Sequence, residues 1–210
     1  MRRRELLASA AVVALTGCAA QRPESGLRFL TPEEAASVAA IADRLIPPDE
    51  LGPGAGEAGA AIFIDRQLAG AYGSSRDLYM RPPFLPGLPG QGPQSPLTPA
   101  ARYRAGLADL DRHCRAAFAG RGFAALDPAT QDRLLSDLEH GRIGISGGGR
   151  AFFDLVLRDT IDGFFADPRY GGNQGMAGWR LIGFPGARYD YRDVVARHGE
   201  PYRAPPVALA

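Results

Sequence analysis

Lysine is absent from this sequence of 210 residues, in which all 24 basic residues are arginine. Without lysine there is no phosphate-binding P-loop and no Schiff-base chemistry, because both depend on a lysine amine. The 23 acidic residues leave a formal net charge of +1. We therefore expect no nucleic-acid partner, since such a partner calls for a marked excess of basic residues.

Cysteine and histidine are also scarce. Cys18 lies near the N-terminus and Cys114 is alone in the body of the chain, so we expect no intrachain disulfide framework. Cys114 falls on the apolar face of a predicted helix, which favours an inert, buried thiol over a reactive or intersubunit one. The three histidines, His113, His140 and His198, share no metal-ligand spacing. The sequence thus predicts no metal and no bound cofactor in this chain.

Long apolar runs are missing too. The run over residues 6–15 follows the arginines at 2–4 and is too short to cross a bilayer, but it is typical of an export signal. Arg3 and Arg4, one residue before a pair of leucines, resemble a twin-arginine leader, which exports proteins already folded. We interpret residues 1–20 as such a signal and expect a periplasmic protein.

The end of this segment also resembles a lipoprotein signal. Leu15-Thr16-Gly17-Cys18 matches the box in which a signal peptidase cleaves before an acylated cysteine. An acyl group on Cys18 would hold the mature protein at a membrane. The alternative is an ordinary signal that is cleaved after Ala20 and releases a soluble periplasmic protein.

The rest of the sequence predicts a mainly α-helical protein, with a single compact domain over residues 29–198 and a tail over residues 199–210. About five helices are expected, joined by long loops rich in glycine and proline. Three of them begin with a capping residue and a proline, at Thr31-Pro32, Thr98-Pro99 and Asp127-Pro128. In chain order, the predicted helices span residues 32–46, 58–68, 99–118, 128–140 and 149–165.

Residues 82–98 contain six prolines and three glycines, a density that no helix or inner strand tolerates. Structureless loops of this length are uncommon in compact domains unless they have a function. Two interpretations stay open, an arm that lies on a partner and a passive surface loop.

Two patterns suggest enzymatic sites, but their context disfavours both. Residues 54–59 have the spacing of a dinucleotide-binding fingerprint, yet the proline-rich stretch before them cannot form the buried strand that the fingerprint requires. The aspartates of helix 149–165 lie on its polar face or just beyond its end, which predicts solvated side chains and no paired-carboxylate site. These are Asp154, Asp159, Asp162 and Asp167.

Residues 167–186 combine many glycines with large aromatic side chains. Such a segment is either an irregular part of the core or a binding loop, and aromatic residues with arginine are typical anchors of protein interfaces. We predict that it contacts a protein partner, with core packing of Trp179 as the alternative. The predicted interface consists of Tyr170, Gly171, Gly172, Asn173, Trp179 and Phe184.

Four motifs stand out in this part of the chain. They are Phe152-Phe153, Asp162-Gly163-Phe164-Phe165, Asp167-Pro168-x-Tyr170-Gly171-Gly172-Asn173 and Gly178-Trp179-x-x-Ile182-Gly183-Phe184-Pro185-Gly186. Together they strongly resemble the gluconate 2-dehydrogenase subunit 3 family, and the resemblance extends over roughly residues 29–190.

The resemblance implies that this chain has a noncatalytic function. Such small subunits accompany FAD-dependent sugar or polyol dehydrogenases of the GMC type, whose large subunit holds FAD and oxidises the substrate, and in some complexes a cytochrome c subunit carries haem c. The small subunit supplies the export signal and escorts the folded flavoprotein. The lipoprotein box is a departure from many relatives. A stand-alone periplasmic lipoprotein or binding module is the alternative.

Overall fold

The computed structural model describes residues 26–91 and 94–209. Within this part of the chain there is no strand, and helices account for 54% of the residues, which confirms the predicted mainly α fold. The longer helices are α2 (Pro32–Leu45), α3 (Ala60–Leu68), α5 (Pro99–Ala117), α6 (Pro128–Glu139) and α7 (Gly149–Phe165). The short elements are α4 (Ala71–Ser74), α8 (Ala177–Ile182) and 3₁₀ turns at Pro89–Gln91, Phe123–Ala125, Pro168–Tyr170, Gln174–Met176 and Arg192–Arg197.

Three helices begin as the sequence predicts. Thr31 and Thr98 accept backbone N–H bonds through their hydroxyls, and Asp127 does so through its carboxylate, with proline next in each case. The start of α2 is a full capping box, because the Glu34 carboxylate also accepts the N–H of Thr31 at 2.8 Å. Helix α3 starts two residues later than predicted, since Gly59 has a φ of +85° and cannot continue a right-handed helix.

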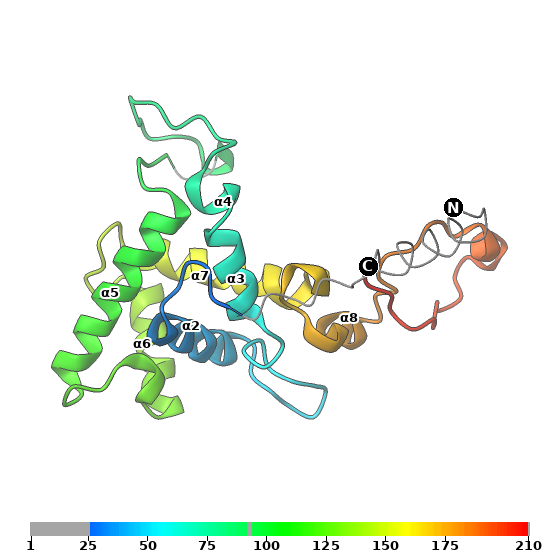
Figure 1. Ribbon diagram of the computed structural model, residues 1–210, viewed down its shortest axis with the longest axis horizontal. Helices are drawn as coiled ribbons and strands as arrows, with labels where there is room; N and C mark the ends of the chain where they lie inside the picture. Colours follow the sequence, from blue (N-terminus) through cyan, green and yellow to red (C-terminus); the bar gives the residue numbers. More distant parts are fainter. Residues whose placement is uncertain (1–25, 92–93, 210) are drawn as a thin grey trace, which may run out of the picture.

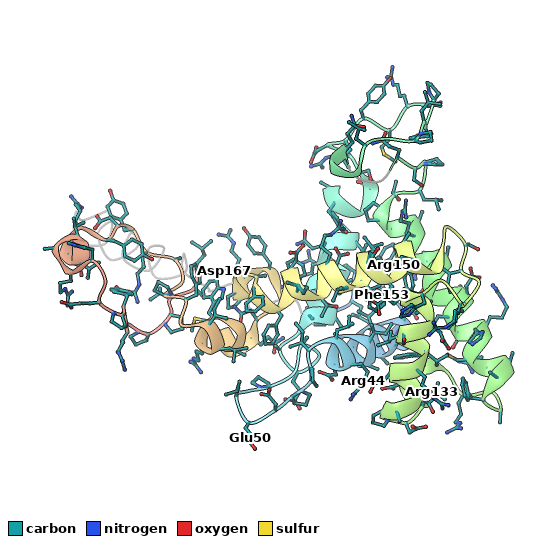
Figure 2. The ribbon with its side chains drawn as sticks, turned by 180° about the vertical axis from the view of Figure 1, so that it is seen from behind. Arg44, Glu50, Arg133, Arg150, Phe153 and Asp167 are labelled. Atoms are coloured by element: carbon teal, nitrogen blue, oxygen red, sulfur yellow. The ribbon has the colours of Figure 1, made fainter. Side chains whose placement is uncertain are left out.

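Helix α7 lies at the centre of the fold (Figure 1). It packs against α2, α3, α5 and α6, and α8 packs near its C-terminal end. Figure 2 shows its direction, with Arg150 near the end that meets α5 and α6 and Asp167 just past the opposite end. The segment predicted as an interface therefore follows directly from the central helix.

The contact between α5 and α7 is close. The rings of Tyr103 and Phe152 meet edge to face, with centroids 6.1 Å apart. A Cβ added at Gly106 would lie 2.3 Å from the Phe152 ring, so only glycine fits there. The main core surrounds this contact and draws on α2, α3 and α6 as well.

Two buried carboxylates join segments that are distant in the sequence. Asp65 on α3 accepts three backbone N–H bonds from residues 28–30, at 2.7 to 2.9 Å, and so fixes the chain that enters α2. Asp109 on α5 accepts the N–H of Ser146 at 2.7 Å and a bond from Arg112 at 2.6 Å. These bonds lower the pKa of Asp109, with the Ser146 donor as the largest cause.

Two parts of the chain project from the helices in Figure 1: the loop between α4 and α5, and the C-terminal residues after α8. Residues 187–206, hereafter the C-terminal arm, leave and return at one place, where Gly186 and Val207 form an isolated bridge. The predicted tail thus returns toward the helices, and the Leu209 N–H donates to Asp167 at 2.8 Å. In the described part of the chain, no helix is both long and apolar enough to span a membrane.

Candidate functional site

The segment after α7 folds back against the end of that helix, and Asn173 holds it there. The Asn173 side chain is fully buried, and its amide donates to the Ala166 carbonyl oxygen at 2.8 Å. Its side-chain oxygen accepts the N–H of Gly178, also at 2.8 Å. The backbone of Asn173 is left-handed, with a φ of +46°, a conformation that asparagine adopts more readily than most residues. One side chain therefore sets both the turn and the start of α8.

Glycines allow the backbone of this segment to lie directly on α7. A Cβ at Gly172 would lie 2.1 Å from the Gly163 carbonyl oxygen, and one at Gly178 would lie 2.2 Å from that of Phe164. Neither position admits a larger residue without a backbone shift, because real Cβ contacts are longer. Gly171 is buried as well.

Trp179 packs inside this chain. Its side chain is 5% exposed, and the indole N–H donates to the Phe165 carbonyl oxygen at 2.7 Å. The ring also meets Phe184 edge to face, with centroids 5.2 Å apart. The structure thus supports the alternative of core packing for Trp179. A direct partner contact by this side chain stays a prediction.

The exposed part of the segment lies on and just after α8. Leu181 and Phe184 are each 44% exposed and Ile182 is 60% exposed, and we call these three residues the α8 face. Tyr170, at 47%, is exposed on the turn that precedes it. Of the six residues predicted for the interface, Tyr170 and Phe184 are on the surface, whereas Gly171, Gly172, Asn173 and Trp179 are buried.

Sequence reasoning missed two members of the α8 face. Leu181 and Ile182 follow Trp179 in a helix of only six residues, which is too short for a helical period to separate inside from outside. The face borders a cavity of about 570 Å³, whose opposite wall is formed by residues 201–206 of the C-terminal arm.

The candidate export and lipidation residues, Arg3, Arg4 and Cys18, lie outside the described residues. Most of the described residues of the proline-rich loop at 82–98 are exposed, with Leu85 and Leu88 largely in solvent, whereas Phe84, Ser95 and Thr98 are partly buried. The choice between a partner arm and a passive loop therefore stays open.

Asp159 corrects one sequence interpretation. Asp154 and Asp162 are exposed, as a solvated helix face requires, but Asp159 is only 4% exposed. Its carboxylate accepts the Tyr72 hydroxyl, at 2.8 and 2.9 Å to the two oxygens, and a bond from Arg158 at 3.1 Å. The period of α7 could not reveal this, because Tyr72 comes from α4, a helix of four residues far away in the sequence.

Burial dominates the electrostatics of this cluster. It raises the pKa of Asp159, although the bonds from Tyr72 and Arg158 oppose the rise. Burial next to a carboxylate also raises the pKa of Tyr72. Tyr103 is fully buried, and burial, followed by the charge of Asp159, raises its pKa as well. Burial is thus the largest cause of the pKa shift in all three of these groups.

Other groups with potential chemistry are structural. Cys114 is buried, as predicted, and burial with the nearby Asp111 carboxylate raises its pKa to about 11. His140 lies at the end of α6, where its Nδ1 is 2.7 Å from the Ser136 carbonyl oxygen. Within residues 26–91 and 94–209, no three His, Cys, Asp or Glu side chains are placed to hold a metal ion.

Comparison with known proteins identifies the family. The model of gluconate 2-dehydrogenase subunit 3 matches residues 32–186, from the first residue of α2 to the glycine that closes the C-terminal arm. The chain belongs to this family. The family is a dehydrogenase subunit, which gives the chain an accessory role and implies a dehydrogenase as its partner in general. No curated protein and no solved structure gives a significant match.

The family match places the segment after α7 inside the shared domain and the C-terminal arm outside it. The matched residues therefore include the platform formed by Gly172, Asn173, Gly178 and Trp179, whereas the arm that borders the α8 face lies outside the match.

Proposed function

We propose that this chain is a noncatalytic small subunit that binds, stabilises and escorts an FAD-dependent dehydrogenase of the GMC type. The observation that carries the proposal is the α8 face, on which apolar side chains are exposed from a backbone held by buried hydrogen bonds. Leu181, Ile182 and Phe184 extend from a platform fixed through Asn173 and Trp179. A preordered surface of this kind loses little side-chain freedom when a partner covers it.

The contribution of the α8 face to the binding free energy follows from how much of each side chain is exposed. Full burial of a leucine, isoleucine or phenylalanine side chain contributes about 1.5–3 kcal/mol. Because the three side chains of the α8 face are already partly covered, each would add about 1 kcal/mol on docking. A charge placed at Ile182 removes that contribution and adds the desolvation of the charge, so the partner would bind far more weakly.

The large subunit supplies the cofactor and the oxidation in this proposal. FAD lies in that partner and not in this chain, and complexes with a third subunit have haem c in a cytochrome c. Sugar or polyol specificity accordingly belongs to the large subunit.

The N-terminal residues supply the export signal and the membrane anchor in this proposal. Arg3 and Arg4 direct the folded pair through the twin-arginine route to the periplasm, and an acyl group on Cys18 anchors the complex at the membrane. Exchanging both arginines for lysine should keep both subunits in the cytoplasm. Exchanging Cys18 for alanine should move the complex from the membrane fraction to the soluble one, with loss of the acyl mass. Normal periplasmic activity in the first variant, or an unchanged distribution in the second, would contradict the corresponding assignment.

Co-purification tests the central interaction. The chain is tagged, expressed with a GMC-type dehydrogenase from its own organism, and isolated, and the flavin absorbance of the eluate is measured. We expect a flavoprotein to elute with the wild-type chain and to be lost with Ile182→Asp. Leu88→Asp, on the proline-rich loop, tests the other surface, and Leu51→Asp, on an exposed turn, is the control. Retention of flavin by Ile182→Asp together with its loss from Leu88→Asp would move the interface to the loop.

The alternative function is a stand-alone periplasmic lipoprotein or binding module. It predicts that no flavoprotein elutes with any variant, and that the chain is exported normally when the dehydrogenase gene is deleted.

A further inference from the structure

A second cavity, of about 620 Å³, lies between α4, the loop that follows it, the start of α5 and α7, and no residue of α8 lines it. Its volume is within the range of about 300–1,000 Å³ that is usual for sites of small organic ligands. Neither the dehydrogenase partner nor the export signal accounts for it.

The walls of this cavity are largely apolar. Its apolar lining residues are Ala71, Leu78, Met80, Leu97, Pro99, Ala151 and Leu155. The polar floor includes Tyr72 and Arg158, both bound to the buried carboxylate of Asp159. An apolar pocket with a few fixed polar groups is the usual form of a site for an amphipathic molecule.

The charges around the cavity are paired, with one exception. Asp154 accepts two bonds from Arg150, at 2.8 and 3.0 Å, and Asp77 lies 3.4 Å from Arg76. Those two lining carboxylates therefore have their own cations, and Arg158 is bound to Asp159.

Arg102 is the exception. Its guanidinium makes one long contact, 3.5 Å to the Leu97 carbonyl oxygen, and no carboxylate in the described ranges pairs with it. It is half-buried at the start of α5 and lines the cavity. A guanidinium favours a carboxylate ligand because it can donate two parallel bonds to the two oxygens.

We propose that this cavity binds an amphipathic carboxylate, such as a medium-chain fatty acid. The hydrocarbon chain lies against Leu78, Met80 and Leu155, and the carboxylate accepts bonds from Arg102. Tyr72 and Arg158 close the polar floor without offering a free charge, so Arg102 alone sets the preference for an anion.

Three ligands of equal chain length test the proposal: octanoate, 1-octanol and octyltrimethylammonium. Each is titrated calorimetrically into the purified full-length chain below its aggregation limit. We expect octanoate to bind at least about tenfold more tightly than 1-octanol, which is the usual effect of one charge-assisted hydrogen bond. We expect the cation to bind most weakly. Equal or tighter binding of the alcohol or the cation, or no binding of octanoate, would overturn the proposal.

Variants separate the head group from the cavity. Arg102→Gln should reduce octanoate affinity about tenfold and leave 1-octanol unchanged. Arg121→Gln is the matched control, because Arg121 also has a single long contact to a carbonyl oxygen, 3.3 Å to Phe118, but does not line the cavity. Ala151→Trp should fill the cavity and abolish binding of both octanoate and the alcohol, with the thermal midpoint recorded to show that each variant folds. Unchanged octanoate affinity in Arg102→Gln or in folded Ala151→Trp would refute the assignment.

Discussion

The exchange Asn173→Asp is the sharpest test of how the α8 face is held. The two side chains have the same shape, and aspartate also tolerates the left-handed backbone at this position. The new carboxylate can still accept the N–H of Gly178, but it cannot donate to the carbonyl oxygen of Ala166, which lies 2.8 Å from the present amide nitrogen. Two buried oxygens would then face each other, and one of them would carry charge.

The expected loss of stability in Asn173→Asp follows from these two hydrogen bonds. A buried acceptor left without its donor costs about 1–3 kcal/mol, and burying the charge adds to that. We expect Asn173→Asp to lower the free energy of unfolding by about 2–4 kcal/mol at pH 7. For a domain of this size the thermal midpoint would fall by roughly 4–15 °C. Thermal unfolding followed by circular dichroism measures this.

The loss of stability in Asn173→Asp should become smaller as the pH falls. Burial raises the pKa of a carboxyl at position 173 in the folded state, so the folded variant holds its proton more tightly than the unfolded one. The deficit relative to wild type should therefore shrink as the pH falls toward about 4, where the protonated carboxyl can donate to Ala166. Gln174→Glu adds the same charge at an exposed neighbour and should change little. An Asn173→Asp midpoint equal to wild type at pH 7, or a deficit that grows on acidification, would refute the role given to Asn173.

Three further predictions concern stability and reactivity. Trp179→Ala should lower the free energy of unfolding of the isolated subunit by about 3–5 kcal/mol. Phe184→Ala should cost less than half as much, because its ring is 44% exposed. Equal urea midpoints for the two variants would contradict the core position of Trp179. Asp109→Ala should cost about 1–3 kcal/mol at pH 7 by leaving the Ser146 N–H unpaired. Because the folded pKa of Asp109 is lowered, the part of its contribution that depends on the charge is present above pH 3.8 and fades as the pH falls below it. A difference from wild type that does not shrink between pH 7 and pH 2 in urea titrations would oppose this. Cys114, with its pKa raised to about 11, should resist a thiol reagent at pH 8 and react rapidly in urea; rapid labelling of the native protein would show that the thiol is accessible.

The sequence predicted the helices well because their start signals are local. Thr31, Thr98 and Asp127 each cap a helix with proline next, and all three are found where expected. The second helix was misplaced by two residues because the conformation of Gly59 depends on its surroundings, and a glycine signals only that an unusual φ is allowed.

For residues 167–186, the sequence predicted a partner contact but not which side chains are buried. Composition identified residues 167–186, yet it could not separate the buried Trp179 from the exposed Phe184. Both are aromatic, and α8, which contains Trp179 and ends two residues before Phe184, has only six residues. Asp159 was expected in solvent, since only the fold brings Tyr72 to it. Such contacts join residues that are distant in the sequence, and no local period encodes them.

The affinity of this subunit for its dehydrogenase tests the central claim most directly. The two chains are purified separately and their Kd is measured by titration, for the wild type and for Ile182→Asp, Leu88→Asp and Leu51→Asp. We predict that Ile182→Asp weakens binding by at least roughly 30-fold, which corresponds to about 2 kcal/mol for a residue at the centre of an interface. Leu88→Asp and Leu51→Asp should stay close to the wild-type affinity. A wild-type Kd for Ile182→Asp would contradict the assignment of the α8 face as the surface that binds the dehydrogenase.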